Sequence, residues 1–333
     1  MEEGLVAQAG YDMKTVHISG FQRKLTPKNL WRNAQTVVRV FTATVEAKRI
    51  IQEFGPDVCV GTGGYVCGPV LREAAKLGIP CVIHESNAYP GVTTKMLAKS
   101  VKAVMLAVPD AKQYFDSSVN CVVTGNPVRG EVLTAQREES RKALGLDERP
   151  VVLSFGGSLG ASALNRAAAY MLAQSAKTGE YQHIHGYGSH DEKFLDECRE
   201  FGLDVEKNPQ IRLLEYIDNM PEMLAAADLV ISRAGALTLA EIAAVGRASV
   251  LIPSPNVAEN HQYHNAMQLQ KLGAAVVVEE KELTGEKLIG IVDKLTKDPA
   301  ELMLMGAKAR ALAQPDSLDK ICENLDQLMK TTA

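Results

Sequence analysis

Two glycine-containing turns in the second half of the chain combine the residue types that bind a nucleotide. The turn at 156–161, Gly-Gly-Ser-Leu-Gly-Ala, follows the apolar run 151–155, and free amides of this kind at a helix start favour phosphate. The segment 233–241, Arg-Ala-Gly-Ala-Leu-Thr-Leu-Ala-Glu, follows the apolar run 229–232. We expect Glu241 in the first helical turn, at the carboxyl edge of a parallel sheet, where open α/β folds bind ligands. Its carboxylate can accept hydrogen bonds from both ribose hydroxyls, so this half predicts a site for a nucleotide-activated donor.

Each of these features also has a simpler structural interpretation, which the sequence leaves open. Thr238 and Glu241 fit a Ser/Thr-x-x-Glu capping box, which needs no ligand. Arg129, the last residue of Gly-Asn-Pro-Val-Arg, either bridges a diphosphate with its forked donors or ends a surface turn. A third glycine-rich turn either lets another molecule approach the backbone closely or only connects a strand to a helix; it consists of Gly61, Thr62, Gly63, Gly64 and Tyr65.

Polar residues gather at two further positions. His84-Glu85-Ser86-Asn87 ends a strand expected at 80–84, and these side chains either bind hydroxyls and move protons or cap a helix. The segment 260–265, Asn-His-Gln-Tyr-His-Asn, begins a helix and either contacts sugar hydroxyls or faces solvent. His261 and His264 lie three residues apart without a carboxylate or cysteine beside them, so no metal site is predicted.

The segment from Lys14 to Arg49 is strongly basic, with Glu46 as its only acidic residue. Its basic residues are Lys14, Arg23, Lys24, Lys28, Arg32, Arg39, Lys48 and Arg49, and its apolar residues include Leu25, Leu30, Trp31, Val37, Val38 and Phe41. This mixture is typical of a helix that lies on an anionic lipid surface. An ordinary amphipathic helix with a solvated basic face has the same composition.

Length and composition indicate a globular protein with two domains, because 333 residues exceed one small core. A net charge of −4 implies no bulk attraction to nucleic acid. The six cysteines form no CxxC pair, so reduced, buried thiols in a cytoplasmic protein are expected. We expect neither a membrane-spanning segment nor a signal peptide.

Short β-branched runs alternate with amphipathic stretches, which predicts parallel sheets covered by helices. Strands are expected at 15–19, 57–61, 80–84, 103–108, 121–124, 151–155, 182–185, 211–216, 229–232, 249–253 and 275–278. Helices are expected at 71–77, 164–174, 239–245, 263–272 and 317–330, and a hinge near 126–130. No strand with a glycine-rich turn opens the first half, so we expect part of that domain to be absent from this chain.

Together these motifs resemble the MurG family, the UDP-N-acetylglucosamine (UDP-GlcNAc) transferases that make lipid II for peptidoglycan. The matching segments are 61–69, 84–87, 125–129, 156–161, 233–241 and 262–263. The resemblance implies an α/β fold of the GT-B type, with two Rossmann-like, doubly wound parallel-sheet domains facing across a cleft. It implies an acceptor and membrane domain at 1–129, joined by a C-terminal helix at 316–333, and a UDP-GlcNAc-binding domain at 130–315.

The resemblance also implies roles for individual residues. Ser158 would contact phosphate, Arg129 would lie at the donor, and the Ile217 backbone would meet uracil. Gln262 and His261 would bind the GlcNAc hydroxyls, and Asn87 would complete the sugar site. The remaining phosphate and ribose contacts would come from Ala236, Leu237, Thr238, Leu239, Ala240 and Glu241, with Glu241 on the ribose.

The activity implied by the resemblance is inverting transfer of GlcNAc to the muramyl 4-hydroxyl of lipid I, without a metal ion or other cofactor. Its implied partners are UDP-GlcNAc, lipid I and an anionic membrane surface, at the cytoplasmic face of the cell membrane, with peripheral attachment and no nucleic acid. The family's opening loop carries a histidine that assists the acceptor, and this chain begins after that point. His84 and Glu85 are therefore the catalytic candidates, and we expect donor binding with slow transfer. Another GT-B lipid glycosyltransferase and a non-catalytic nucleotide-sugar binding protein are the alternatives.

Overall fold

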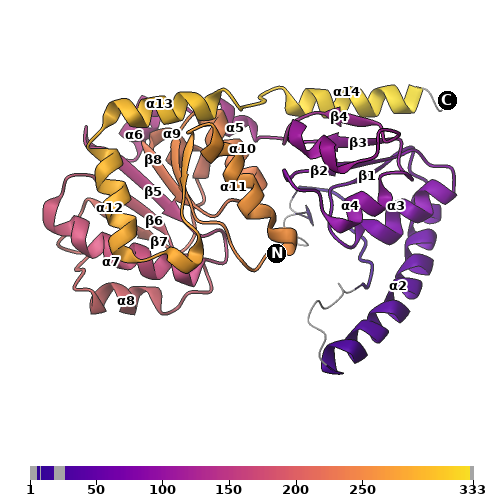
Figure 1. Ribbon diagram of the computed structural model, residues 1–333, viewed down its shortest axis with the longest axis horizontal. Helices are drawn as coiled ribbons and strands as arrows, with labels where there is room; N and C mark the ends of the chain where they lie inside the picture. The colour runs from indigo at the N-terminus through magenta and orange to yellow at the C-terminus, as the bar shows by residue number, and fades with distance from the viewer. Residues whose placement is uncertain (1–5, 8, 19–26, 331–333) are drawn as a thin grey trace. The chain divides into compact units, whose positions relative to one another are not determined.

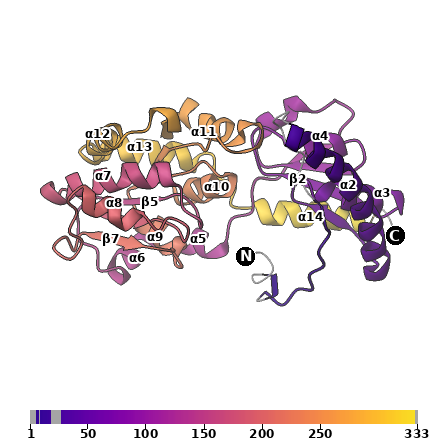
Figure 2. The same ribbon diagram turned by 90° about the horizontal axis from the view of Figure 1, so that it is seen from below.

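The computed structural model describes residues 6–7, 9–18 and 27–330, with only the backbone described from residue 27 to residue 38. Within these residues the chain forms two compact α/β units (Figures 1 and 2). The first unit comprises 1–86, 90–124 and 319–333, and the second comprises 87–89 and 125–318. Each unit is built on one parallel sheet, which confirms the predicted fold class of two parallel-sheet α/β domains.

The sheet of the first unit has four parallel strands in the order β1-β2-β3-β4. They are β1 (Cys59–Gly61), β2 (Cys81–Glu85), β3 (Ala103–Leu106) and β4 (Cys121–Val123). Helices α2 (Pro27–Phe54), α3 (Cys67–Lys76) and α4 (Val92–Leu97) contribute Ile51, Leu71 and Leu97 to a core on one face. On the other face Val82 and Met105 pack against Ile321 of α14 (Ser317–Lys330).

The sheet of the second unit has six parallel strands in the order β10-β9-β8-β5-β6-β7. They are β5 (Val151–Phe155), β6 (Gln182–Gly186), β7 (Ile211–Leu214), β8 (Leu229–Ser232), β9 (Ala248–Leu251) and β10 (Ala275–Val277). The first strand in the chain, β5, is central; β6 and β7 follow on one side of it, and β8, β9 and β10 follow on the other side. The strand order therefore reverses between β5 and β8, and ligands of open α/β sheets bind at such a reversal.

Both faces of this sheet are covered, so every residue of its central strands β5 and β8 is buried and most of them are apolar. On one face Leu153 of β5 packs in a core with Leu224 and Ile242, and on the other Val152 packs in a core with Leu164 and Val292. The helices of this unit are α5 (Gly130–Thr134), α6 (Arg137–Ala143), α7 (Ser162–Thr178), α8 (Phe194–Glu200), α9 (Met220–Ala226), α10 (Ala236–Val245), α11 (His261–Lys271), α12 (Gly285–Thr296) and α13 (Pro299–Arg310). Short 3₁₀ turns, η1 (Pro109–Tyr114), η2 (Ala258–Asn260) and η3 (Glu280–Glu282), complete the described elements.

The strands expected from residue 57 onward are all present, with ends within two residues of the predicted ones. The strand expected at 15–19 is wrong for residues 15–18, and Ser19 lies outside the described residues. Although its residues alternate as in a strand, the backbone of residues 15–18 pairs with none of the strands that the structure describes. Instead, the amide of His17 donates to Oε2 of Glu46 at 3.0 Å, and its ring Nδ1 lies 3.2 Å from Oε1.

Candidate functional site

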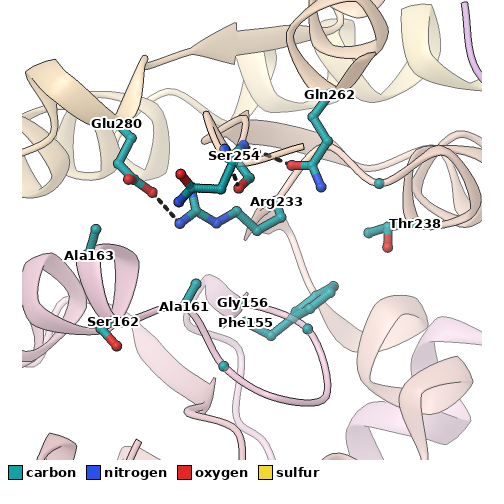
Figure 3. A pocket seen from close by; sticks show the side chains of 14 residues that line it. Phe155, Gly156, Ala161, Ser162, Ala163, Arg233, Thr238, Ser254, Gln262 and Glu280 are labelled. Atoms are coloured by element: carbon teal, nitrogen blue, oxygen red, sulfur yellow. Dashed lines mark hydrogen bonds and ion pairs between the residues drawn. The ribbon is translucent and has the colours of Figure 1, made fainter. Parts of the chain in front are cut away.

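Loops from four strands of the second unit surround a cavity of about 560 Å³ at the carboxyl ends of β5 and β8 (Figure 3). This is the position at which the strand order reverses. The cavity is lined by Phe155, Gly156, Gly157, Gly160, Ala161, Ser162, Ala163, Arg233, Gly235, Thr238, Ser254, Asn256, Gln262 and Glu280. The two turns singled out in the sequence thus meet at one edge of the sheet.

The turn after β5 lines the cavity largely with glycine backbone, and the amide of Gly160 closes the turn by donating to the carbonyl oxygen of Gly157 at 3.0 Å. Gly157 and Gly160 have φ of +99° and +86°, a conformation that favours glycine. A Cβ atom on Gly160 would lie 2.3 Å from the carbonyl oxygen of Tyr187, so no side chain fits there. Helix α7 follows with Ala161 at its N-cap and no side-chain cap. The first amides of this 17-residue helix therefore remain available to an anion.

A second, smaller cavity of about 220 Å³ shares Phe155, Gly157 and Thr238 with the first. It brings together five of the residues that the resemblance assigned to the donor: Arg129, Ser158, Ile217, Thr238 and Glu241. Oε1 of Glu241 accepts a hydrogen bond from Nε of Arg129 at 3.0 Å and lies 2.9 Å from Nη2 of the same guanidinium in an ion pair. The Arg129 side chain is 51% exposed and that of Glu241 is 17% exposed. A carboxylate and a guanidinium are thus held side by side at the cavity wall.

Helix α10 begins earlier than the capping-box interpretation requires. Its N-cap is Gly235, without a side-chain cap, so Thr238 is the third helical residue. Glu241 therefore lies in the second helical turn, and the expectation of a first-turn position is wrong. Thr238 and Glu241 therefore do not form a capping box, and the interpretation of these two residues as a helix cap is wrong.

The apolar residues at the start of α10 offer a ligand their backbone rather than their side chains. Leu239 packs in the core below the sheet edge, whereas Leu237 is exposed. The amides of Ala236, Leu237 and Thr238 belong to the first helical turn, whose N–H groups have no partner within a helix. Ala240 is half-buried one residue before Glu241.

Arg233 and Glu280 form an ion pair on the opposite wall of the first cavity (Figure 3). Arg233 also donates from Nη1 to the carbonyl oxygen of Ile252 at 3.1 Å, and its side chain is only 14% exposed. Sequence reasoning missed Glu280, which follows β10 without a motif. Its position after the carboxyl end of a neighbouring strand was the only available signal.

Gln262 enters the same cavity from the start of α11. Its Oε1 accepts a hydrogen bond from the amide of Ser254 at 2.8 Å, which fixes the carboxamide and directs the NH₂ group into the cavity (Figure 3). His261 precedes it as the first residue of α11 and does not line either cavity. The backbone before it is unusual, because Glu259 and Asn260 both adopt positive φ, 51° and 50°.

Asn265 on α11, the last residue of the polar segment 260–265, connects three segments, a role that the sequence did not predict. Its Oδ1 accepts from the amide of Ala88 at 2.9 Å, and its Nδ2 donates to Oδ1 of Asn87 at 3.0 Å and to the carbonyl oxygen of Ala234 at 3.3 Å. Tyr89 stacks on the ring of His264, with 4.9 Å between centroids. Residues 87–89 thereby belong to the second unit.

His84 and Glu85 end β2 in the first unit, and both are buried. Oε2 of Glu85 accepts hydrogen bonds from the amide of Gly91 at 2.9 Å and from Oγ1 of Thr94 at 2.7 Å. Ser86 Oγ lies 3.4 Å from Nδ1 of His84. Helix α4 has Gly91 at its N-cap, so neither Ser86 nor Asn87 caps it. The contacts of Glu85 shape the loop between β2 and α4.

The glycine-rich turn after β1 also lies in the first unit, before α3. Gly61 is required by packing, since a Cβ atom there would lie 2.5 Å from Cδ1 of Leu71. Gly63 and Gly64 have φ of +94° and +78° with open space around them. Thr62 is exposed, and so is Tyr65. The turn thus combines a structural glycine with an open surface.

The basic segment is described only in part. Phe21, Arg23, Lys24 and Leu25 lie outside the described residues, as do the side chains of Lys28, Leu30, Trp31, Arg32, Val37 and Val38. In the described part, Phe41 and Val45 of α2 are each 71% exposed. They line a surface hollow of about 730 Å³ together with Lys14 and Arg49, and Arg49 pairs with Glu53 at 2.7 Å.

Two properties of the described residues concern metals and membranes. Between residues 6 and 330, apart from the undescribed stretches, no group of three or more His, Cys, Asp or Glu side chains could hold a metal ion. None of the helices described there combines the length and the apolar character needed to cross a membrane.

Comparison with known proteins identifies relatives over nearly the whole chain. The glycosyltransferase family 28 N-terminal domain matches residues 1–106, and the family 28 C-terminal domain matches residues 151–321. The chain is 42% identical over 322 residues to the UDP-N-acetylglucosamine–N-acetylmuramyl-(pentapeptide) pyrophosphoryl-undecaprenol N-acetylglucosamine transferase of Thermoanaerobacter sp. (strain X514), covering 96% of this chain and 86% of that protein. It is 39% identical over 334 residues to the transferase of the same name from Acetivibrio thermocellus, covering 100% of this chain and 88% of that protein.

A solved structure agrees with these relatives. The crystal structure of Acinetobacter baumannii MurG superimposes with a TM-score of 0.76 at 30% sequence identity, covering 98% of this chain and 88% of that chain.

Proposed function

The chain belongs to glycosyltransferase family 28, and we propose that it transfers GlcNAc from UDP-GlcNAc to the muramyl 4-hydroxyl of lipid I, giving lipid II and UDP. The observation that carries this proposal is the convergence of Arg129, Ser158 and Glu241 on one cavity that adjoins the glycine turn after β5. A nucleoside diphosphate has an anionic diphosphate and a ribose diol. Arg129 and Ser158 can donate hydrogen bonds to the diphosphate, and Glu241 can accept hydrogen bonds from the diol.

The proposed donor position follows from the two adjoining cavities. The pyrophosphate would bind at the amides of Gly156–Ala161 and the start of α7, with Ser158 beside it. The ribose would bind at Glu241, and the uracil would meet the backbone of Ile217. The GlcNAc hydroxyls would accept from the NH₂ group of Gln262, whose orientation Ser254 fixes.

The proposed reaction breaks the bond between C1 of GlcNAc and the pyrophosphate and forms a bond from C1 to the acceptor oxygen, with inversion at C1. The leaving UDP gains negative charge, which the amides of α7 and the guanidinium of Arg129 can stabilise. This stabilisation requires no metal ion, because helix α7 fixes the direction of its amides and Glu241 holds the guanidinium of Arg129 in place.

A base must remove the proton of the acceptor hydroxyl, and His84 and Glu85 remain our candidates. Oε2 of Glu85 is already engaged by hydrogen bonds from Gly91 and Thr94, which hold the loop between β2 and α4. We therefore place His84 ahead of Glu85. The turn of Gly61, Thr62, Gly63, Gly64 and Tyr65 remains our proposal for acceptor contact.

We also propose peripheral attachment to an anionic membrane surface at the cytoplasmic face, where lipid I would be met. The exposed Phe41 and Val45, next to Lys14 and Arg49, support this proposal. Apolar side chains flanked by cations are typical of surfaces that insert shallowly into the headgroup region.

An assay of the full chain with radiolabelled UDP-GlcNAc and a lipid I analogue tests the proposal. We expect label in a product the size of lipid II, and a large loss of this product in Arg129→Ala but not in Arg199→Ala, an exposed arginine with a surface partner. Label in a diacylglycerol supplied instead would favour another lipid glycosyltransferase. UDP-GlcNAc binding without transfer to either acceptor would favour a nucleotide-sugar binding protein.

A further inference from the structure

Two cysteines of the first unit lie opposite each other on neighbouring strands. Cys59 opens β1, Cys81 opens β2, and the two residues are register partners in the parallel ladder. Neighbouring strands lie about 4.8 Å apart, and the Cα atoms of disulfide-bonded cysteines are usually about 4.4–6.8 Å apart. The backbone therefore holds this pair at a distance that a disulfide can span.

Both side chains point to the same face of the sheet, toward α3. A Cβ atom on Gly61, two residues after Cys59, would meet Leu71 and Sγ of Cys67, so this strand face is the α3 side. Residues two apart in a strand share a face, which places Cys59 there as well. Sγ of Cys81 lies 3.5 Å from the carbonyl oxygen of Leu71 on α3, so it faces the same way.

The two thiols differ in reactivity. A hydrogen bond from the thiol of Cys81 favours the thiolate of Cys59 and lowers the pKa of Cys59 to about 7. The same hydrogen bond, together with burial, raises the pKa of Cys81. Cys59 is half-buried and Cys81 is buried. Because thiolates are the nucleophiles in thiol chemistry, Cys59 is suited to react first and Cys81 second.

We propose that Cys59 and Cys81 form a reversible disulfide with a low-molecular-weight disulfide, such as oxidised glutathione, as the oxidant. The Cys59 thiolate attacks one sulfur of the oxidant, forming a mixed disulfide and releasing one thiolate, which takes up a proton. Cys81 then loses its proton and attacks the Cys59 sulfur, releasing the second small thiol. The protein thiols lose two electrons in total, and these electrons reduce the oxidant to two thiols.

Cys67 also lies on this face of the sheet, so it is the alternative to Cys59 as the cysteine that bonds to Cys81. Its Sγ donates to the carbonyl oxygen of Gly63 at 2.7 Å, which orients it toward the glycine-rich turn rather than into the ladder. Cys322 is the exposed thiol that any oxidant reaches first. These two positions provide the controls for the assignment.

The test is peptide mapping of the folded full chain after incubation with oxidised glutathione, with free thiols blocked before digestion. Trypsin leaves Cys59 in the peptide 50–72, together with Cys67, and Cys81 in the peptide 77–95. We expect these two peptides to be linked, to separate on reduction, and to remain linked in Cys67→Ser and Cys322→Ser. Cys81→Ala, and independently Cys81→Ser, should stop at a glutathionylated Cys59.

Three results would overturn the proposal. They are a link that disappears in Cys67→Ser, glutathione found only on Cys322 in the wild type, and unmodified Cys59 in both Cys81 variants. The wild-type map decides the question even where a Cys81 variant does not fold, and none of these results depends on glycosyltransferase activity.

Discussion

Arg129 and Glu241 are 112 residues apart in the sequence, yet Nε of the arginine donates to Oε1 of the carboxylate and Nη2 lies 2.9 Å from the same oxygen. Each group holds the other at the wall of the smaller cavity. The second oxygen of Glu241 keeps its capacity to accept a hydrogen bond, and Arg129 has further N–H groups to donate. The pair is therefore a preorganised unit with one acceptor and several donors.

Glu241→Ala is expected to weaken UDP binding by about 1–3 kcal/mol, the range for loss of a charged hydrogen-bond partner, or about 5- to 150-fold in Kd. Titration calorimetry measures this change. Glu197→Ala is the matched control, since Glu197 accepts from Arg166 at 2.9 Å in an ion pair that lines neither donor cavity. Equal UDP affinities for the two variants would restrict Glu241 to a role in folding.

Glu280→Gln is expected to lower the free energy of unfolding by about 1–3 kcal/mol, because it leaves the half-buried guanidinium of Arg233 with a weaker partner. Urea unfolding followed by circular dichroism measures this loss. Asp196→Asn removes the partner of Arg199 in a pair whose side chains are 70% and 73% exposed, where about 0–1 kcal/mol is expected. An unchanged unfolding midpoint for Glu280→Gln would contradict the structural role of the pair.

Stability is expected to fall as the pH drops from 7.5 to 5.5, because His183 and His185 are buried and neutral in the folded protein. Oγ of Ser154 lies 2.7 Å from Nε2 of His183 and 2.6 Å from Nδ1 of His185. Burial lowers the pKa of His185 to about 3 and lowers that of His183 well below its usual value. Unfolding raises each pKa to about 6.5, so the unfolded state takes up the protons.

The stabilising contribution of each histidine is complete above the unfolded pKa and decreases below it, by about 1.4 kcal/mol per pH unit. Urea unfolding at several pH values measures this slope. The double variant His183→Gln/His185→Gln should flatten it between pH 6.5 and 5.5, whereas His190→Gln, at an exposed position, should keep it. A wild-type stability that is constant over this interval would contradict the burial of neutral histidines.

Phe41→Ser is expected to reduce binding to vesicles that contain anionic lipid, by about 1.5–3 kcal/mol if the ring is fully inserted. Vesicle flotation at low and high salt measures both the apolar and the electrostatic part. Met303→Ser, at a position that is 74% exposed on α13 of the second unit, should have no effect. Equal binding to neutral and anionic vesicles would remove the electrostatic part of the proposed membrane contact.

The sheet of the second unit was predictable because its central strands are buried on both faces and read as apolar runs with clear ends. The strand expected at 15–19 was not, because alternation indicates a strand only where a neighbouring strand is available. His17 found Glu46 instead. The contact depends on Glu46 of helix α2, which lies 29 residues further along the chain, so the sequence around His17 does not indicate it.

The candidate site was predictable where a motif lies in one segment, as at Gly156–Ala161, Arg129 and Gln262. The start of α10 was misplaced because Thr238 looked like a cap, whereas Gly235 ends the preceding loop in an extended conformation. Glu280 was missed, and the contacts of Asn265 were not predicted, because both residues bond to partners that lie 47 and 31 residues away, Arg233 and Ala234. Long-range pairs of this kind leave no local pattern.

The three residues Asn87–Tyr89 leave one unit of the fold and join the other, and this has a practical consequence for dissecting the protein. A fragment that starts at Gly125 and ends at Leu318 would contain every strand of the six-stranded sheet but not these residues. Asn265 would then lose its bonds to Asn87 and Ala88, and His264 would lose the ring of Tyr89. A fragment meant to contain the whole second unit therefore has to carry residues 87–89 as well as 125–318.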